Sequence, residues 1–400
     1  MRYLAATERF FQDAPGGAYR VAWDLAQLLL SAGHEVTLLC GSTDRDPPPG
    51  PATVEGVRVV RYRFPETWAA NPLRSHLALA AARSAAAPLL AERRWDVLHA
   101  HAPTLALALF PKAPKPTRLV YTMHSPAVLE QQINWSNAGL TGQLKLLLGM
   151  PLLRRQERET LHRAHVVHVL SDYTRREVER LYGHLLASKI VRIPWWPNPG
   201  GVSVGKAEAR RRLALPAGGK VLLSLRRMVP RMGLDLFLEA AEGLAAAFDF
   251  TLVLAGEGPQ RAQLEAQAAR GPLAARVRFP GRLSDDQVGW AYEACDAFVL
   301  PTRALECFGI IVVEAFARDR PVLGANVGAI PELLGAVLPE WLFEGNSVPA
   351  LRTALERLLS GALAAPAPGV LERHAREQFG REKLGREYLA LLGAPEAAAP

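Results

Sequence analysis

Cysteine is scarce in this chain of 400 residues. The three cysteines, Cys40, Cys295 and Cys307, lie far apart and form no C-x-x-C pair. This spacing excludes a disulfide framework and a cysteine-rich metal site, and it is typical of a protein from a reducing compartment.

Long apolar segments are also missing. No apolar run reaches the ~18 residues that a membrane-spanning helix needs, and the N-terminus MRYLAATERFF lacks the apolar core of a secretory signal. We therefore expect a cytoplasmic protein without membrane-spanning helices.

The bulk composition is that of a soluble globular protein, with 49% hydrophobic and 22% charged residues. Its length predicts two domains. The net charge of +8 comes from the first half, because residues 1–200 hold 24 Lys and Arg against 16 Asp and Glu, while residues 201–400 hold 23 of each. Either the first half meets an anionic partner, or its arginines are spread over a solvated surface.

Strand and helix patterns alternate along the first half. Helical apolar periodicity is clearest over residues 17–32, where Gly33 ends it, and Ser171 is a good N-cap for a helix over 173–182. A further alanine-rich helix is predicted over 75–90. The predicted strands are 2–6, 35–40, 57–62, 96–100, 117–123, 165–170 and 190–193.

The segment Pro194-Trp195-Trp196-Pro197-Asn198-Pro199 interrupts this pattern, because its prolines remove hydrogen-bond donors and fix φ. We place a domain boundary here, with residues 1–197 before it and 198–379 after it. The pattern then restarts, with strands predicted over 220–225, 250–255, 277–279, 297–300 and 321–323 and a helix over 234–245. Two blocks of alternating units predict an α/β protein with two doubly wound, Rossmann-like parallel-sheet domains.

The stretch PTRALECFGIIVVEAFA, residues 301–317, places two carboxylates in an apolar strand-turn-helix corner. Gly309 begins the helix, so the first amides point unpaired N–H groups at a ligand beyond the strand ends, which suits an anion. Glu306 and Glu314 are good acceptors for paired sugar hydroxyls, so the corner predicts a nucleotide-sugar site. Alternatively, the two acids are ordinary exposed residues near a helix N-terminus.

A basic segment follows the first strand of the second domain. Arg226, Arg227 and Arg231 lie between that strand and the next helix. Arginines at this edge of a sheet are suited to binding a diphosphate in a bidentate manner. The segment therefore supplies the cations that the acidic corner lacks.

Four motifs together resemble the family-4 retaining glycosyltransferases (glycosyl transferases group 1) of the GT-B fold. In order they are Pro15-Gly16-Gly17, the RR-x-V-x-R-M-G segment from Arg226, Leu254-Ala255-Gly256-Glu257-Gly258-Pro259, and the E-x7-E stretch from Glu306 to Glu314. The resemblance implies two domains that face each other across a cleft. It also implies acceptor binding in the first domain, donor binding in the second, and a C-terminal helix, about 380–393, that packs back on the first.

The resemblance also implies roles for single residues. Arg227 matches the arginine on the donor diphosphate, Glu314 the glutamate on the ribose, and Glu306 the glutamate near the donor sugar. The family's usual lysine is Met232 here, so either Arg231 or Arg226 replaces it. The other matched positions are Phe308, Gly309 and Ile310 in the backbone-binding turn, Gly16 and Gly17 in the phosphate loop, and His124 near the donor sugar; His99 and His101 are interpreted as structural.

The implied reaction moves a hexose from a nucleoside-diphosphate sugar to a lipid, saccharide or small-molecule acceptor, with retention and without a protein nucleophile. No D-x-D-like metal site accompanies the donor motifs, so we expect no metal and no cofactor beyond the nucleotide sugar. Two alternatives stay open: a nucleotide-sugar 2-epimerase of the same fold, and a non-enzymatic two-domain binding protein. A nucleic-acid binder lacks the expected interleaving of aromatic and basic residues.

The segment Lys145–Arg192 holds ten basic residues against five acidic ones and includes the apolar run Leu146–Leu153. One interpretation is an amphipathic stretch that rests on an anionic membrane and collects a lipid-linked acceptor. The enzyme would then be peripheral on the inner face of the membrane. The other interpretation is an ordinary helix with leucines in the core and solvated arginines.

Overall fold

The computed structural model describes residues 1–14, 16–64, 74–92, 94–136 and 139–393. The chain forms two compact units. Unit 1 comprises residues 1–195 together with the C-terminal segment from residue 382, and unit 2 comprises residues 196–381. The segment Pro194–Pro199 at their boundary has no regular secondary structure.

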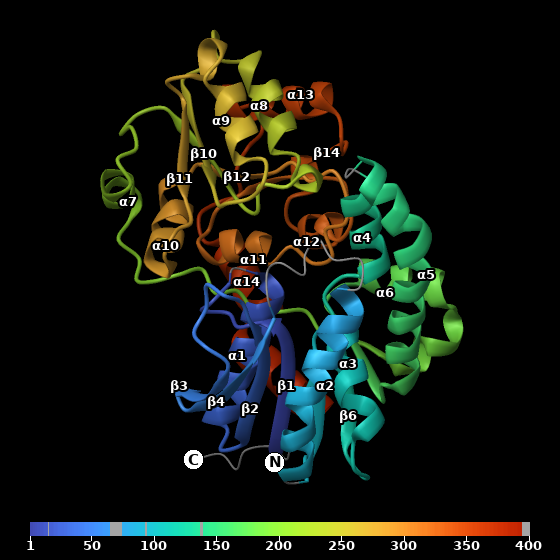
Figure 1. Cartoon of the computed structure of the whole chain (residues 1–400). Coiled ribbons are helices and arrows are strands. Elements are labelled where there is room, and N and C mark those ends of the chain that lie inside the picture. Colours follow the sequence, from blue (N-terminus) through green and yellow to red (C-terminus); the bar gives the residue numbers. More distant parts are fainter. Residues whose placement is uncertain (15, 65–73, 93, 137–138, 394–400) are drawn as a thin grey trace. The chain divides into compact units, whose positions relative to one another are not determined.

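Unit 1 is built on an eight-stranded sheet in the order β3-β4-β2-β1-β5-β6-β7-β8, parallel except for β3 (Figure 1). The strands are β1 (Arg2–Arg9), β2 (Glu35–Ser42), β3 (Gly50–Val54), β4 (Val57–Arg63), β5 (Val97–Ala100), β6 (Arg118–Met123), β7 (Val166–Val169) and β8 (Ile190–Arg192). The helices are α1 (Gly17–Ser31), α2 (Arg74–Glu92), α3 (Pro103–Leu109), α4 (Ala127–Ser136), α5 (Gly139–Arg163), α6 (Asp172–Tyr182) and α15 (Arg381–Leu392).

Two features of unit 1 bear on the sequence predictions. The hydroxyl of Ser171 accepts from the amide of Thr174 across 3.1 Å, which confirms the predicted helix cap. The antiparallel edge strand β3 was not predicted, because its Gly-Pro start is poor strand sequence. Pro51 is tolerated because it lies in an edge strand, where an N–H is not needed.

Helix α15 packs on unit 1 through Tyr388, which is 1% exposed. Its ring stands edge-on to the rings of His168 and Trp195, with centroids 5.0 and 4.9 Å away. Its hydroxyl lies 3.0 Å from Nε2 of His168 and donates to the carbonyl of Ile193 across 3.1 Å. The last helix is thereby fixed to the ends of β7 and β8.

Unit 2 contains a six-stranded parallel sheet in the order β11-β10-β9-β12-β13-β14. Its strands are β9 (Lys220–Leu225), β10 (Phe250–Ala255), β11 (Val277–Gly281), β12 (Ala297–Leu300), β13 (Val322–Ala325) and β14 (Leu342–Phe343). Its helices are α7 (Lys206–Arg212), α8 (Leu234–Glu242), α9 (Arg261–Ala268), α10 (Asp285–Ala294), α11 (Ile310–Ala317), α12 (Ile330–Leu334), α13 (Val348–Ser360) and α14 (Val370–Phe379). The sequence did not predict the two-residue strand β14.

Both sheets have the doubly wound topology that the sequence predicts. In each, the strand order reverses beside the first strand, between β1 and β5 in unit 1 and between β9 and β12 in unit 2. Ligands of such sheets bind outside the carboxyl ends of the strands at this switch point. In the described part of the chain, no helix is long and apolar enough to cross a membrane.

Candidate active site

An arginine–glutamate pair lies at the carboxyl edge of the unit 2 sheet. Arg226 directly follows β9, and Glu306 lies in the connection from β12 to α11. Nη2 of Arg226 donates to Oε2 of Glu306 across 2.9 Å, and Nη1 donates to Oγ1 of Thr302 across 2.7 Å. Only 4% of the Arg226 side chain and 15% of the Glu306 side chain are exposed. The pair therefore occupies the switch point with little access to solvent.

The Arg226 guanidinium also reaches the position where the resemblance expects a lysine. Nη2 of Arg226 lies 2.6 Å from the sulfur of Met232. Burial lowers the pKa of Arg226, and the charge of Glu306 opposes that change. Nε of Arg226 is buried and has no hydrogen-bond partner within the described ranges.

The other two arginines of the segment have different surroundings. Arg231 donates from Nη1 to the carbonyl of Leu305 across 3.1 Å and so fixes the backbone beside Glu306. Arg227 is exposed, and no ion pair is formed by its side chain among the residues that the structure describes. Arg227 is thus a cation that no ion pair among the described residues requires.

The end of β10 and the loop that follows it form backbone hydrogen bonds with this arginine segment. The amide of Met228 donates to the carbonyl of Glu257 across 2.9 Å, and the amide of Arg226 donates to Ala255 across 2.9 Å. Gly256 has φ +125°, and a Cβ there would lie 2.1 Å from the carbonyl oxygen of Arg226. The Leu254–Pro259 motif therefore needs glycine because two backbone segments meet there.

Gly309 caps the start of helix α11 and has φ +88°, in the left-handed region. The amide of Val312 donates to the carbonyl of Gly309 across 2.9 Å. The amides of Ile310 and Ile311 have no acceptor inside the helix, so this start is suited to an anion. Ile310 is partly exposed, whereas Phe308 is 5% exposed and packs edge-on against Phe379. Phe308 therefore contributes its backbone to the turn, and its ring anchors the turn in the core.

Glu314 lies within α11 and is partly exposed. Its Oε2 accepts from the hydroxyl of Tyr292, which is fully buried, across 2.9 Å. This bond fixes one carboxylate oxygen, so the carboxylate of Glu314 has a defined orientation. Neither Tyr292 nor Thr302 was predicted from the sequence, because Tyr292 is 22 residues from Glu314 and Thr302 is 76 residues from Arg226, to which it hydrogen-bonds.

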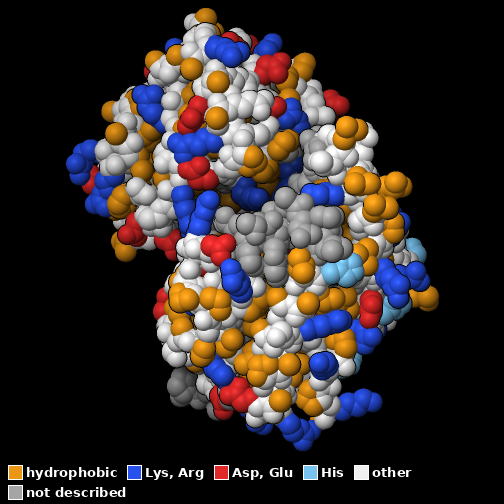
Figure 2. Space-filling view, in the orientation of Figure 1, with side chains coloured by type: hydrophobic (Ala, Val, Ile, Leu, Met, Phe, Trp, Pro, Cys, Tyr) orange, Lys and Arg blue, Asp and Glu red, His pale blue; other side chains and the backbone are white. Residues whose placement is uncertain are grey.

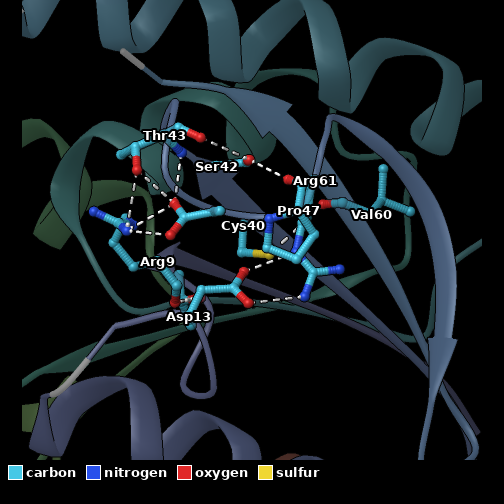
Figure 3. Close-up of polar contacts among 10 residues, drawn as sticks. Arg9, Asp13, Cys40, Ser42, Thr43, Pro47, Val60 and Arg61 are labelled. Atoms are coloured by element: carbon cyan, nitrogen blue, oxygen red, sulfur yellow. Dashed lines mark hydrogen bonds and ion pairs between the residues drawn. The ribbon is translucent and has the colours of Figure 1, made fainter. Parts of the chain in front are cut away.

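In unit 1, an ion-pair cluster fixes the segment that precedes Gly16 and Gly17 (Figure 3). Nε of Arg61, on β4, donates to Asp13 across 2.8 Å, and both side chains are 6% exposed. The same guanidinium lies over the ring of Phe10, 4.7 Å from its centroid. Gly16 caps α1 and Gly17 is its first residue, while Pro15 lies outside the described residues.

A chain of buried polar groups crosses unit 1 beneath the strand ends. The hydroxyl of Tyr3 lies 2.7 Å from Nδ1 of His99. Nε2 of His99 lies 2.6 Å from Oγ1 of Thr122. Thr122 in turn lies 2.9 Å from Nδ1 of His168, whose Nε2 lies 2.9 Å from the carbonyl of Ile193.

Burial lowers the pKa of His99 well below its usual value and that of His168 to about 4, so both imidazoles are neutral. The Ile193 carbonyl only accepts, so Nε2 of His168 carries the proton and Nδ1 accepts from Thr122. Thr122 then accepts from Nε2–H of His99, whose Nδ1 accepts from Tyr3. All four hydrogen bonds therefore run in one direction.

His124 directly follows β6 and is partly exposed. Its Nε2 lies 2.9 Å from Nδ1 of His101, and the two rings are stacked with centroids 5.2 Å apart. The sequence analysis interpreted His101 as structural, although the i, i+2 spacing of His99 and His101 already placed both on one face of a strand. Burial lowers the pKa of His124 to about 3.

The family models and relatives that this chain matches are all described as glycosyltransferases. Residues 15–196 match the model described as Glycosyltransferase Family 4, and residues 205–378 match Glycosyl transferases group 1. A phosphatidyl-myo-inositol mannosyltransferase from Mycolicibacterium smegmatis is 30% identical over 329 residues, which cover 80% of this chain and 75% of the relative. A 2-deoxystreptamine glucosyltransferase from Streptomyces kanamyceticus is 30% identical over 248 residues, which cover 60% of this chain and 62% of that relative.

Solved structures show the same fold. A sucrose-phosphate synthase from Thermosynechococcus elongatus has a TM-score of 0.77 at 22% identity, covering 98% of both chains. WaaG, a glycosyltransferase involved in lipopolysaccharide biosynthesis, has a TM-score of 0.75 at 17% identity, covering 98% of this chain and 100% of WaaG.

Proposed function

Because the chain belongs to the family 4, group 1 glycosyltransferases of the GT-B fold, which transfer sugar from a nucleotide sugar, we propose that it is a retaining, metal-independent hexosyltransferase with its donor site in unit 2. The observation that carries this assignment is the Arg226–Glu306 pair at the β9/β12 switch point, beside the start of α11. Cations, a helix N-terminus and oriented carboxylates match the parts of a nucleoside-diphosphate sugar.

Each group has a role in this site. The exposed Arg227 and the first amides of α11 bind the diphosphate, where negative charge grows as the leaving group departs. Glu314, oriented by Tyr292, accepts from the ribose hydroxyls, and Glu306 lies at the donor sugar. The family resemblance assigns Gly16 and Gly17 of unit 1 to the donor phosphate and His124 to a hydroxyl of the donor sugar.

Arg226 takes the place of the family's lysine. Its Nη2 lies at the end of the Met232 side chain and contacts Glu306 at the same time. Arg231 is directed to the carbonyl of Leu305 instead, so its role is to hold the Glu306 loop.

The proposed step retains the anomeric configuration. The bond from the anomeric carbon to the diphosphate oxygen breaks, and the acceptor oxygen bonds to that carbon on the same face. The acceptor proton passes to the departing phosphate oxygen. The protein supplies charge and position and no nucleophile.

We further propose a lipid-linked acceptor collected at an anionic membrane surface, so that the enzyme works on the inner face of the membrane. The relatives named above include a transferase for a phosphatidyl-inositol lipid as well as one for a small molecule. The observation in favour of a lipid is α5, whose leucines at 140, 144, 147 and 148 are 84%, 57%, 71% and 67% exposed. In the run Leu146–Leu153, the alternative of leucines in the core is therefore wrong for Leu147 and Leu148, whereas Leu146, Leu152 and Leu153 are half-buried.

A basic surface follows the exposed leucines towards the C-terminus of the same helix. Arg154, Arg155 and Arg158 line a hollow of about 580 Å³ with Pro151, Leu181 and Tyr182. Leucines and arginines seven residues apart share one face of a helix, and they are separated by about 10 Å along its axis. Figure 2 shows hydrophobic side chains gathered where Figure 1 places α4 and α5. If the leucines enter the acyl region of a lipid bilayer, the arginines lie at the depth of the lipid phosphates.

The direct test is thermal stabilisation by a panel of UDP-, GDP- and ADP-linked hexoses, because a tight donor raises the melting temperature by mass action. The stabilising donor is then incubated with candidate acceptors, and the anomeric configuration of the product is determined. Nucleotide release with an α-linked product from an α-linked donor supports the proposal. An epimerised sugar supports the alternative enzyme, and an inverted product overturns the retaining mechanism.

A further inference from the structure

The hydrogen bond between His101 and His124 has one proton for two ring nitrogens. Nδ1 of His101 and Nε2 of His124 are 2.9 Å apart, at the carboxyl ends of the adjacent strands β5 and β6. Burial lowers the pKa of both imidazoles far below their usual value, so both rings are neutral. Each ring then carries a single N–H, and the two rings cannot both donate to each other.

The surroundings of His101 decide which ring donates. His101 is 8% exposed, and its Nε2 is buried without a hydrogen-bond partner in the described part of the chain. A buried N–H without an acceptor is rarer and costlier than an unfilled lone pair. The proton of His101 is therefore on Nδ1, and Nε2 of His124 accepts a hydrogen bond from this N–H.

The orientation of His101 is itself fixed by the polar chain beneath it. Its ring stacks on His99 with centroids 4.3 Å apart and an interplanar angle of 27°. Both nitrogens of His99 are engaged, by Tyr3 and by Thr122. A flip of His101 would have to occur within this packed stack, so the direction of its Nδ1 is determined by the fold.

We propose that His101 is a positioning residue that donates from Nδ1 to Nε2 of His124 and thereby holds His124 as the Nδ1–H tautomer, with that N–H directed at a hydroxyl of the sugar substrate. The tautomer follows from unit 1 alone, whereas the contact with sugar rests on the proposed function. Without His101, His124 would also populate the Nε2–H tautomer that imidazoles favour in water, and the substrate-facing nitrogen would lose its proton.

The experiment is long-range ¹⁵N–¹H correlation NMR on the full-length enzyme with ¹⁵N-labelled histidine, in which the His124 signals are assigned by their loss in His124→Gln. We expect Nδ1–H for His124 in the wild type. In His101→Phe, which keeps a ring but no donor, we expect a shift towards Nε2–H and a kcat/KM for the donor lower by on the order of 10-fold. In His101→Asn, whose side-chain amide takes the place of Nδ1, the Nδ1–H tautomer and most of the activity should return.

Two matched variants separate positioning from a general effect on the fold. His101→Gln puts an amide near the former Nε2 and should not restore the tautomer. His99→Phe removes partners of Tyr3 and Thr122, so it should lower the melting temperature and leave the tautomer of His124 unchanged. If His101→Phe fails to fold, the comparison of His101→Asn with His101→Gln carries the test.

The inference is overturned if wild-type His124 is the Nε2–H tautomer, or if the tautomer is the same in all folded His101 variants. A shifted tautomer with unchanged turnover would leave the positioning role standing. That result would instead remove His124 from the sugar site of the proposed function.

Discussion

The guanidinium of Arg226 lies 2.6 Å from the sulfur of Met232 and 2.9 Å from the carboxylate of Glu306. An arginine thus brings its charge to the position at which the family resemblance expects a lysine. We therefore expect that a lysine at position 232 can replace the charge of Arg226.

Arg226→Ala should lower kcat/KM by on the order of 100-fold, because it removes a charge beside the donor and leaves Glu306 unpaired. The double variant Arg226→Ala/Met232→Lys should recover part of that loss, since the lysine enters the vacated space next to Glu306. Steady-state kinetics on the single and double variants are the measurement. If the folded double variant is as inactive as Arg226→Ala and Arg231→Ala is equally inactive, Arg231 is the replacement.

Arg227→Ala should lower kcat by about 100-fold with an unchanged melting temperature. The reason is that the exposed Arg227 makes no ion pair in the described part of the chain, while its proposed partner charge grows in the transition state. Arg352→Ala, at an exposed arginine of α13, is the control and should keep full activity. Equal turnover in the two variants would exclude Arg227 from the diphosphate site.

Glu314→Ala should weaken binding of the matching nucleoside diphosphate by roughly 1–3 kcal/mol, because ribose hydroxyls lose a charged acceptor. Tyr292→Phe keeps the carboxylate and removes only the hydroxyl that orients it, so its effect on affinity should be smaller. Titration calorimetry measures both. Wild-type affinity in folded Glu314→Ala would contradict the ribose assignment.

Sedimentation with vesicles tests the membrane surface on α5. Binding should require anionic lipid and fade with rising salt, because ions screen exposed charges. Leu147→Ser/Leu148→Ser and Arg154→Ser/Arg155→Ser should each abolish it, whereas Leu185→Ser, at a leucine that is 94% exposed outside the helix, should not. A wild-type protein that stays in the supernatant with anionic vesicles at low salt would favour a soluble acceptor.

The buried histidine chain predicts a loss of stability in mild acid. Burial lowers the pKa of His168 to about 4, below the value of about 6.5 in an unfolded chain. The unfolded state therefore binds the proton first, and stability that is complete above pH 6.5 is lost as the pH falls towards 4. The loss from this group should be about 2 kcal/mol between pH 7.5 and 5.

Urea unfolding at the two pH values measures that difference. His168→Gln, which cannot titrate, should be less stable at pH 7.5 but should show a smaller decrease at pH 5. An equal decrease in both proteins would place the acid sensitivity elsewhere.

The sequence by itself determined the two doubly wound sheets, the cap at Ser171 and the helix start at Gly309. These features depend on local information, namely apolar periodicity, side-chain hydrogen bonds over three residues and the φ that only glycine adopts easily. The edge strands β3 and β14 were not predicted, because they are short and their pairing depends on neighbouring strands and not on their own sequence pattern.

Only the tertiary structure decided the contacts within the candidate site and the surface of α5. Arg226 and Glu306 are 80 residues apart, and Tyr388 and His168 are 220 apart, so each pair depends on sheet order and chain return. The exposure of Leu147 and Leu148 was equally hidden, because a helix has the same apolar period whether its leucines face a core or solvent. Local sequence sets the conformation of each segment, whereas its partners depend on which strands the fold makes adjacent.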